Sequence, residues 1–312
     1  MQDQLADDRQ HATAAVARRP PALRQTPELR LAITALLAAA ALLCFAANSL
    51  LARAALGSAR ADPATFTALR VVSGAVALAL LAAARRRRAA GGSWTSAMAL
   101  LGYAGAFSLA YVRIPTGVGA LLLFPAVQVT MIGIGIAQGA RPSRRQWLGV
   151  AVALAGLAYL TRPGAHGGDA IGATLMVLAG VSWGIYSLRG RAARDPLATT
   201  ADNFVRATAL ALPLAAAFVL AEGGRLTFSG AALAIASGAL ASGGGYTLWY
   251  AVMPSLGATR AAALQVTVPA IAATGGVLLL GEPVTVRLVA SAAVILAGVA
   301  LTLSRPRAGS DR

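Results

Sequence analysis

The sequence predicts an all-α integral membrane protein with ten transmembrane helices, arranged as two inverted five-helix repeats. The chain of 312 residues is 57% hydrophobic and only 12% charged, whereas a typical soluble domain has about 25% charged residues. Its long apolar blocks alternate with short arginine clusters, which is typical of membrane proteins. Two stretches, 139–160 and 281–302, also resemble each other without a gap, so that Gly156 falls on Gly298. An internal repeat of this kind favours a secondary transporter whose site lies between the halves.

The apolar blocks each approach the ~20 residues that a spanning helix needs. Turn and charge signals such as Asp62-Pro63, the arginines 85–88 and Glu282-Pro283 separate them. We predict helices over 31–52, 64–84, 94–112, 116–138, 146–162, 170–188, 198–221, 229–250, 257–280 and 285–303. The first repeat then covers 31–162 and the second 170–304, between a disordered N-terminal tail at 1–30 and a C-terminal tail at 305–312. The three glycines at 243–245 predict a hinge within the eighth block.

Arginine counting gives the orientation. One set of loops, including both tails, holds 19 arginines, and the other set holds 6. Cytoplasmic loops carry the excess of basic residues, so both termini are expected in the cytoplasm. Ten spans satisfy that condition, and five spans in each copy force the copies to insert in opposite directions. The loops agree, because the arginine-rich loops of the first copy match arginine-poor loops in the second.

The matching prolines Pro125 and Pro269, the Gly-Glu-Pro run at 281–283 and the stretch 245–269 resemble the EamA-type members of the drug/metabolite transporter superfamily. The resemblance covers about residues 31–304. It implies a ten-helix inverted repeat that moves small metabolites, including amino acids, without covalent chemistry. The family usually has a glutamate after the fourth helix as well, where this sequence has Ala140 or Gln138, depending on the alignment.

Several other classes of function lack support in the sequence. The formal net charge is +16, but the arginines lie between apolar blocks, so retention in the membrane explains them better than nucleic-acid binding. Neither histidine lies in an apolar block, and Cys44 is the single cysteine. We therefore expect no metal site and no cofactor. A nucleotide-binding glycine-rich motif, a Ser/His/Asp set and paired acids are also missing, so we expect no enzyme.

Charged groups inside apolar blocks are costly and invite an explanation. Arg70 and Arg206 lie inside or at the edge of predicted helices, each following an Asp-Pro pair. They either attract a substrate carboxylate or phosphate, or tie helices together near the interface. Asp202 precedes Arg206 by one helical turn, as an ion pair would. If transport is driven by protons, Asp202 is the candidate carrier.

The two prolines predict broken helices, because each removes a backbone donor inside an apolar block. Gln128 follows Pro125 and Gln265 precedes Pro269. These amides either line a polar cavity near the midplane or bond the carbonyls that the prolines free.

Aromatic residues make up only 5% of the chain. Trp183, Tyr186 and Tyr246 lie within predicted helices and either stack on a substrate or belong to an interfacial belt. Asn48 lies deep in the first helix, as a bond between helices or a ligand contact. Small-xxx-small spacings, as at Gly180 and Gly184, allow close helix packing and a homodimer.

The sequence thus predicts a transporter of the cell inner membrane that works by alternating access. Its expected partners are the lipid bilayer and a small amphipathic metabolite, such as an amino acid that it exports. The alternatives are a transporter of lipid- or nucleotide-linked sugars, and a membrane scaffold or sensor that carries no flux.

Overall fold

The computed structural model describes residues 27–139, 141–162, 169–190 and 193–303. The regular elements of this part are all helices: α2 (Pro27–Leu56), α3 (Pro63–Ala84), α4 (Trp94–Arg113), α5 (Thr116–Ala137), α6 (Arg144–Thr161), α7 (Ala170–Gly190), α8 (Pro196–Glu222), α9 (Phe228–Ile235), η1 (Ala236–Gly244), α10 (Gly245–Gln265), α11 (Val268–Leu280) and α12 (Val286–Leu303). Six of them, α2 to α5, α7 and α8, have the length and apolar composition to cross a membrane. Two shorter apolar helices lie at 268–280 and 286–302.

The described chain forms two compact units, Met1–Leu36 and Leu37–Arg312. The described part of the first unit is the beginning of α2, which runs through the boundary into the second. The tails predicted at 1–30 and 305–312 lie outside the described residues, apart from Pro27–Arg30 in α2.

Side-chain caps start several helices where the sequence places Asp, Ser or Thr. Asp62 and Asp195 each accept a backbone N–H of the first turn, and a proline follows each of them at the start of the helix. Ser143 and Gln146 form a reciprocal capping box before α6. Such caps satisfy backbone donors that have no partner within the helix, which explains why these boundaries match the predicted ones closely.

The eighth and ninth predicted helices were misplaced. The chain is helical from Phe228 to Gln265 and continues through Pro254, where we predicted a separator; the next helix begins at Val268 instead of 257. A single proline removes one backbone donor, and a helix held by its neighbours tolerates that loss. The true break falls just before Pro269, which occupies the first turn of α11, where its missing N–H costs nothing.

Glycines at 243–245 do mark an irregular segment. Residues Ala236–Gly244 form a π-helix, η1, between α9 and α10. π-Helical segments inside α-helices are rare, and those that occur are frequently found at functional sites. A methyl group on Gly238 would collide with the backbone carbonyl of Arg70, so η1 rests directly on α3 at that turn.

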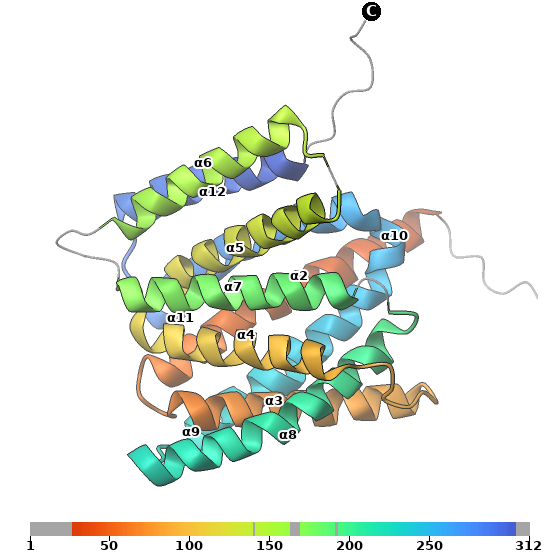
Figure 1. Ribbon diagram of the computed structural model, residues 1–312, viewed down its shortest axis with the longest axis vertical. Coiled ribbons are helices and arrows are strands. Elements are labelled where there is room, and N and C mark those ends of the chain that lie inside the picture. Colours follow the sequence, from red (N-terminus) through yellow and green to blue (C-terminus); the bar gives the residue numbers. More distant parts are fainter. Residues whose placement is uncertain (1–26, 140, 163–168, 191–192, 304–312) are drawn as a thin grey trace, which may run out of the picture. The chain divides into compact units, whose positions relative to one another are not determined.

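Three helices pack against the helices that hold the corresponding place later in the chain. These pairs are α3 with α8, α5 with α11 and α6 with α12; Figure 1 shows the last pair side by side. Gly149 lies against Thr302, Gly156 against Ile295, and the carbonyl of Arg162 accepts from Arg287, so α6 and α12 run antiparallel.

The other two pairs are antiparallel as well. Asp62, before α3, accepts the backbone N–H of Arg225, after α8, while Gly74 farther along α3 lies against Phe204 near the start of α8. In the third pair, Thr116 at the start of α5 lies against Gly276 near the end of α11. Helices that correspond in the two predicted repeats are therefore antiparallel in all three pairs.

Candidate functional site

Arg70 is the centre of the candidate site. Its side chain is 3% exposed, and it is the one charged residue among the buried polar residues of the described chain. Its Nη2 donates to the hydroxyl of Tyr103 at 3.0 Å. The guanidinium also lies 4.8 Å from the ring centroid of Phe107 and 5.1 Å from that of Tyr103. Ring faces stabilise a cation in such positions, yet Nη1 is buried without a hydrogen-bond partner.

A chain of buried hydrogen bonds joins Arg70 to two other helices. Asn48 of α2 donates from Nδ2 to the Tyr103 hydroxyl at 3.4 Å, and Ser237 of η1 donates to Asn48 Oδ1 at 2.5 Å. Tyr103 belongs to α4 and Arg70 to α3. The network therefore connects α2, α3 and α4 of the predicted first repeat with the π-helical segment η1 of the predicted second repeat.

A stack of aromatic rings borders this network. Trp183 of α7 lies 4.9 Å from Tyr103 between ring centroids, and stacks at 5.4 Å on Tyr186 and at 5.5 Å on Tyr246. Tyr246 stacks further on Tyr250, whose hydroxyl bonds that of Thr200. The structure thus brings together, from four helices, the predicted residues Asn48, Arg70, Trp183, Tyr186 and Tyr246. We call this group the central cluster.

Arg206 lies elsewhere. It pairs with Asp202 on its own helix, with Nε 3.1 Å from Oδ1, and its guanidinium covers the ring of Trp94. The Asp-Pro pairs show why the two arginines differ: Arg70 stands eight residues after Asp62, and the residue eight after Asp195 is Asn203. Asn203 is the buried one, at 3% exposure. Asn203 therefore holds the position that corresponds to Arg70, and Arg206 lies three residues beyond it.

Gln128, Gln265, Pro125 and Pro269 meet in a separate small cavity of about 10 Å³. This volume is at the lower limit for one water molecule. Pro125 lies inside α5, which runs from Thr116 to Ala137 as one helix. Pro269 instead begins a helix. The two prolines are spatial neighbours without being equivalent breaks.

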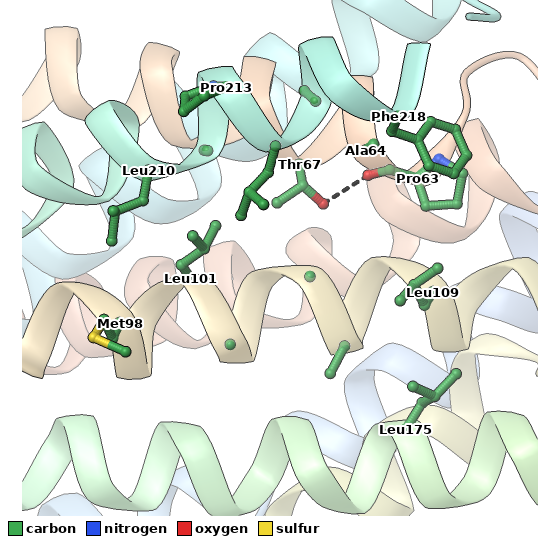
Figure 2. Close-up of a pocket in the computed structure, with 16 residues that line it drawn as sticks. Pro63, Ala64, Thr67, Met98, Leu101, Leu109, Leu175, Leu210, Pro213 and Phe218 are labelled. Carbon is green, nitrogen blue, oxygen red and sulfur yellow. Dashed lines mark hydrogen bonds between the residues drawn. The ribbon is translucent and has the colours of Figure 1, made fainter. Parts of the chain in front are cut away.

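Another cavity, of about 850 Å³, has a different character. It lies between α3, α4 and α8 with Leu175 of α7, and its lining is almost wholly apolar (Figure 2). Its hydroxyl group, that of Thr67, already donates to the carbonyl of Pro63 and bonds Ser108. Met98 and Leu214 of its wall are more than half exposed. None of the predicted site residues lines this cavity.

The interactions of Glu282 were not predicted from the sequence. Glu282, in the loop after α11, accepts the backbone N–H of Thr116 at 2.9 Å with both oxygens and the Thr116 hydroxyl at 3.1 Å. Arg53 at the end of α2 donates from Nε to Glu282 at 3.3 Å and from Nη1 to the carbonyls of Tyr111 and Val112. The Gly-Glu-Pro run singled out Glu282 in the sequence, but nothing there linked it to Arg53. We call this arrangement the Glu282 clamp.

Among the described residues, no group of three His, Cys, Asp or Glu side chains lies close enough together to hold a metal ion. The chemistry that the central cluster offers is recognition: one guanidinium, hydroxyl and amide groups, and stacked ring faces.

Known proteins with similar sequences are membrane transporters or uncharacterized proteins. Residues 170–304 match the model of the EamA-like transporter family. An uncharacterized protein of Pseudomonas aeruginosa is 50% identical over 280 residues, which cover 88% of this chain and 96% of that protein. An uncharacterized transporter of Archaeoglobus fulgidus is 23% identical over 201 residues, covering 64% of this chain and 71% of that one.

A solved crystal structure shares the fold, with a TM-score of 0.60 and 21% identity over 84% of this chain and 96% of the other. Together with the apolar helices, these similarities describe a multi-pass membrane protein that transports small solutes. The chain belongs to the EamA-like transporter family.

Proposed function

We propose that the chain is a secondary or facilitative transporter that exports small metabolites, such as amino acids, across the inner membrane by alternating access. Its two five-helix halves, 31–162 and 170–304, are inverted relative to each other, and both termini are cytoplasmic. The central cluster is the substrate site between the halves.

The antiparallel packing of equivalent helices is the observation that carries this proposal. Gly156 lies against Ile295, and its counterpart Gly298 lies against Ala153, which is the residue that corresponds to Ile295. Such reciprocal contacts are expected of two similar halves related by a twofold axis in the membrane plane. The family match also spans 170–304, the range predicted for the second half.

The position of the central cluster supports its role as the substrate site. It draws on α2, α3 and α4 before residue 162 and on α7, η1 and α10 after residue 170. Buried polar groups are costly in a membrane and mark solute pathways. A site built from both halves is exposed to alternate sides when the halves rock against each other.

Transport is tested with purified protein in liposomes. A panel of radiolabelled amino acids and nucleotide sugars is offered with and without a pH gradient, and protein-free liposomes serve as the control. Saturable flux of an amino acid supports the proposal. Flux of nucleotide sugars alone favours the sugar-transport alternative, and a sealed protein without flux of any compound favours a scaffold or sensor.

Orientation is tested separately with single cysteines. In a Cys44→Ala background, Ser58→Cys and Ala89→Cys place a thiol in exposed positions before and after α3. An impermeant thiol reagent applied to intact cells is expected to label Ser58→Cys and not Ala89→Cys. Labelling with the opposite preference contradicts the proposed orientation.

A further inference from the structure

We infer that Arg70 is the residue that binds an anionic group of the substrate, and that the substrate is a small monocarboxylate with an apolar body. This inference deepens the proposed transport function and rests on it. It follows from an unpaired buried nitrogen, from the positions of the acidic side chains and from the walls around the guanidinium.

The guanidinium of Arg70 has one hydrogen-bonding group left over. Tyr103 accepts from Nη2, whereas Nη1 is buried without a partner. A buried donor without a partner is destabilising, and more so when it carries charge. The ring faces of Tyr103 and Phe107 compensate part of that charge, but they accept no hydrogen bond from Nη1.

None of the described acidic side chains forms an ion pair with Arg70. Asp202 and Glu282 pair with Arg206 and Arg53, and the remaining pairs are Arg87–Asp195 and Arg113–Asp169. Asp62 accepts backbone N–H groups, and Glu28 and Glu222 are exposed near helix ends. Arg70 therefore has no counter-ion in the described part of the chain, and a bound anion would supply one.

The charge of the site favours a carboxylate over a phosphate. Arg70 is the single buried cation among the residues whose burial is described. Arg206 of α8 is partly exposed, and its guanidinium lies over the ring of Trp94. One guanidinium balances one negative charge and matches the two oxygens of a carboxylate. A diphosphate-linked sugar would bring more negative charge than this cluster neutralises.

The aromatic rings of the central cluster indicate the chemistry of the rest of the ligand. The guanidinium lies over the rings of Phe107 and Tyr103, Trp183 packs against Tyr103, and Tyr246 stacks on Trp183. Such ring faces bind apolar groups, and they also stabilise an ammonium. An amino acid with an apolar side chain fits this combination through its carboxylate.

Binding is measured by the rise in unfolding temperature of the purified protein in nanodiscs. The probes are leucine, phenylalanine and 4-methylpentanoate, each compared with its carboxamide, which removes the negative charge and keeps the size. The variants are Arg70→Gln and Arg70→Lys. Arg225→Gln is the charge control, because it removes a positive charge at an exposed side chain. An ordered near-ultraviolet spectrum shows that each variant is folded.

At least one carboxylate is expected to stabilise the wild type and Arg225→Gln, while its amide does not. Charge-assisted hydrogen bonds predict affinity that is roughly 10- to 100-fold weaker in Arg70→Gln. Arg70→Lys keeps the charge but not the planar pair of donors, so its affinity is expected to lie between those of the wild type and Arg70→Gln.

Equal stabilisation by the amide overturns the inference, as does undiminished carboxylate binding by folded Arg70→Gln. Absence of stabilisation by every probe also overturns it. Failure of the proposed transport function gives a different result. Carboxylate binding that depends on Arg70, without flux of any compound in liposomes, would support the binding site and contradict transport.

Discussion

A carboxylate from the second half of the chain accepts a backbone N–H near each end of α4, but the two carboxylates pair with their arginines in different ways. At the beginning of α4, Asp202 accepts the backbone N–H of Gly92 at 2.8 Å. Beyond the end of α4, Glu282 accepts the backbone N–H of Thr116. Since α4 has 20 residues, these two contacts lie about 30 Å apart, the thickness of a hydrocarbon core.

The difference lies in the arginine that each carboxylate uses. Asp202 pairs with Arg206 one turn along the same helix, so this ion pair connects nothing across the halves. Glu282 pairs with Arg53, 229 positions away, which also holds two carbonyls at the end of α4. The two carboxylates therefore act differently: the ion pair of Asp202 is local, whereas that of Glu282 links the two predicted halves.

Removal of Glu282 is expected to have the largest effect. Glu282→Ala leaves the N–H of Thr116 and Nε of Arg53 without their acceptor, in a place where the glutamate side chain is 12% exposed. We expect a loss of about 2–4 kcal/mol in the free energy of unfolding, measured by denaturant titration in mixed micelles. Glu282→Gln retains an acceptor and should lose less. Equal stability of Glu282→Ala and the wild type would contradict the role of the clamp.

Release of each end is distinguished by thiol accessibility. Ala97 and Ala120 are both fully buried and follow Ser93 and Thr116 by four residues. In a Cys44→Ala background, Glu282→Gln should speed the labelling of Ala120→Cys and leave Ala97→Cys unchanged. Faster labelling at both positions would show general loosening instead of the opening of one end.

Asp202→Asn should have a smaller effect. The amide retains an acceptor for Gly92, and the lost ion pair is partly exposed, so we expect a cost of less than about 1 kcal/mol. Because Asp202 holds a backbone N–H and its own arginine, we also expect any pH dependence of uptake to survive this substitution. Loss of that dependence in liposomes, with stability retained, would restore Asp202 as the proton carrier.

The smallest expected effect concerns Asp169, near the Glu282 end. The guanidinium of Arg113 donates to this carboxylate at 2.8 Å and lowers the pKa of Asp169 below its ordinary value. A lowered pKa contributes stability above the ordinary value, and that contribution disappears as the pH falls through the folded-state pKa. The difference in unfolding temperature between the wild type and Asp169→Asn should therefore be constant from about pH 5 to 7 and shrink at lower pH. A difference that changes near neutral pH would contradict this assignment.

Much of the fold could be predicted from local signals. Apolar block length, Asp-Pro starts and arginine-rich separators located most helices, because a helix in lipid must satisfy its own backbone and bury no charge. The same reasoning failed at Pro254, since a proline is a separator only where the neighbouring helices do not hold the chain together. Pro125, which was predicted inside a helix, does lie within a continuous one.

The candidate site, too, could be predicted only in part from the sequence. By itself, the sequence determined which residues are costly in a membrane, such as Arg70, Asn48 and Trp183, because that cost depends on residue type and on the apolar surroundings. The tertiary structure alone decided which of them meet. It buried Arg70 among rings while it left Arg206 with Asp202, and it joined Arg53 to Glu282 across 229 positions. Pairing of this kind depends on how helices distant in the chain pack, and neither local periodicity nor spacing records that packing.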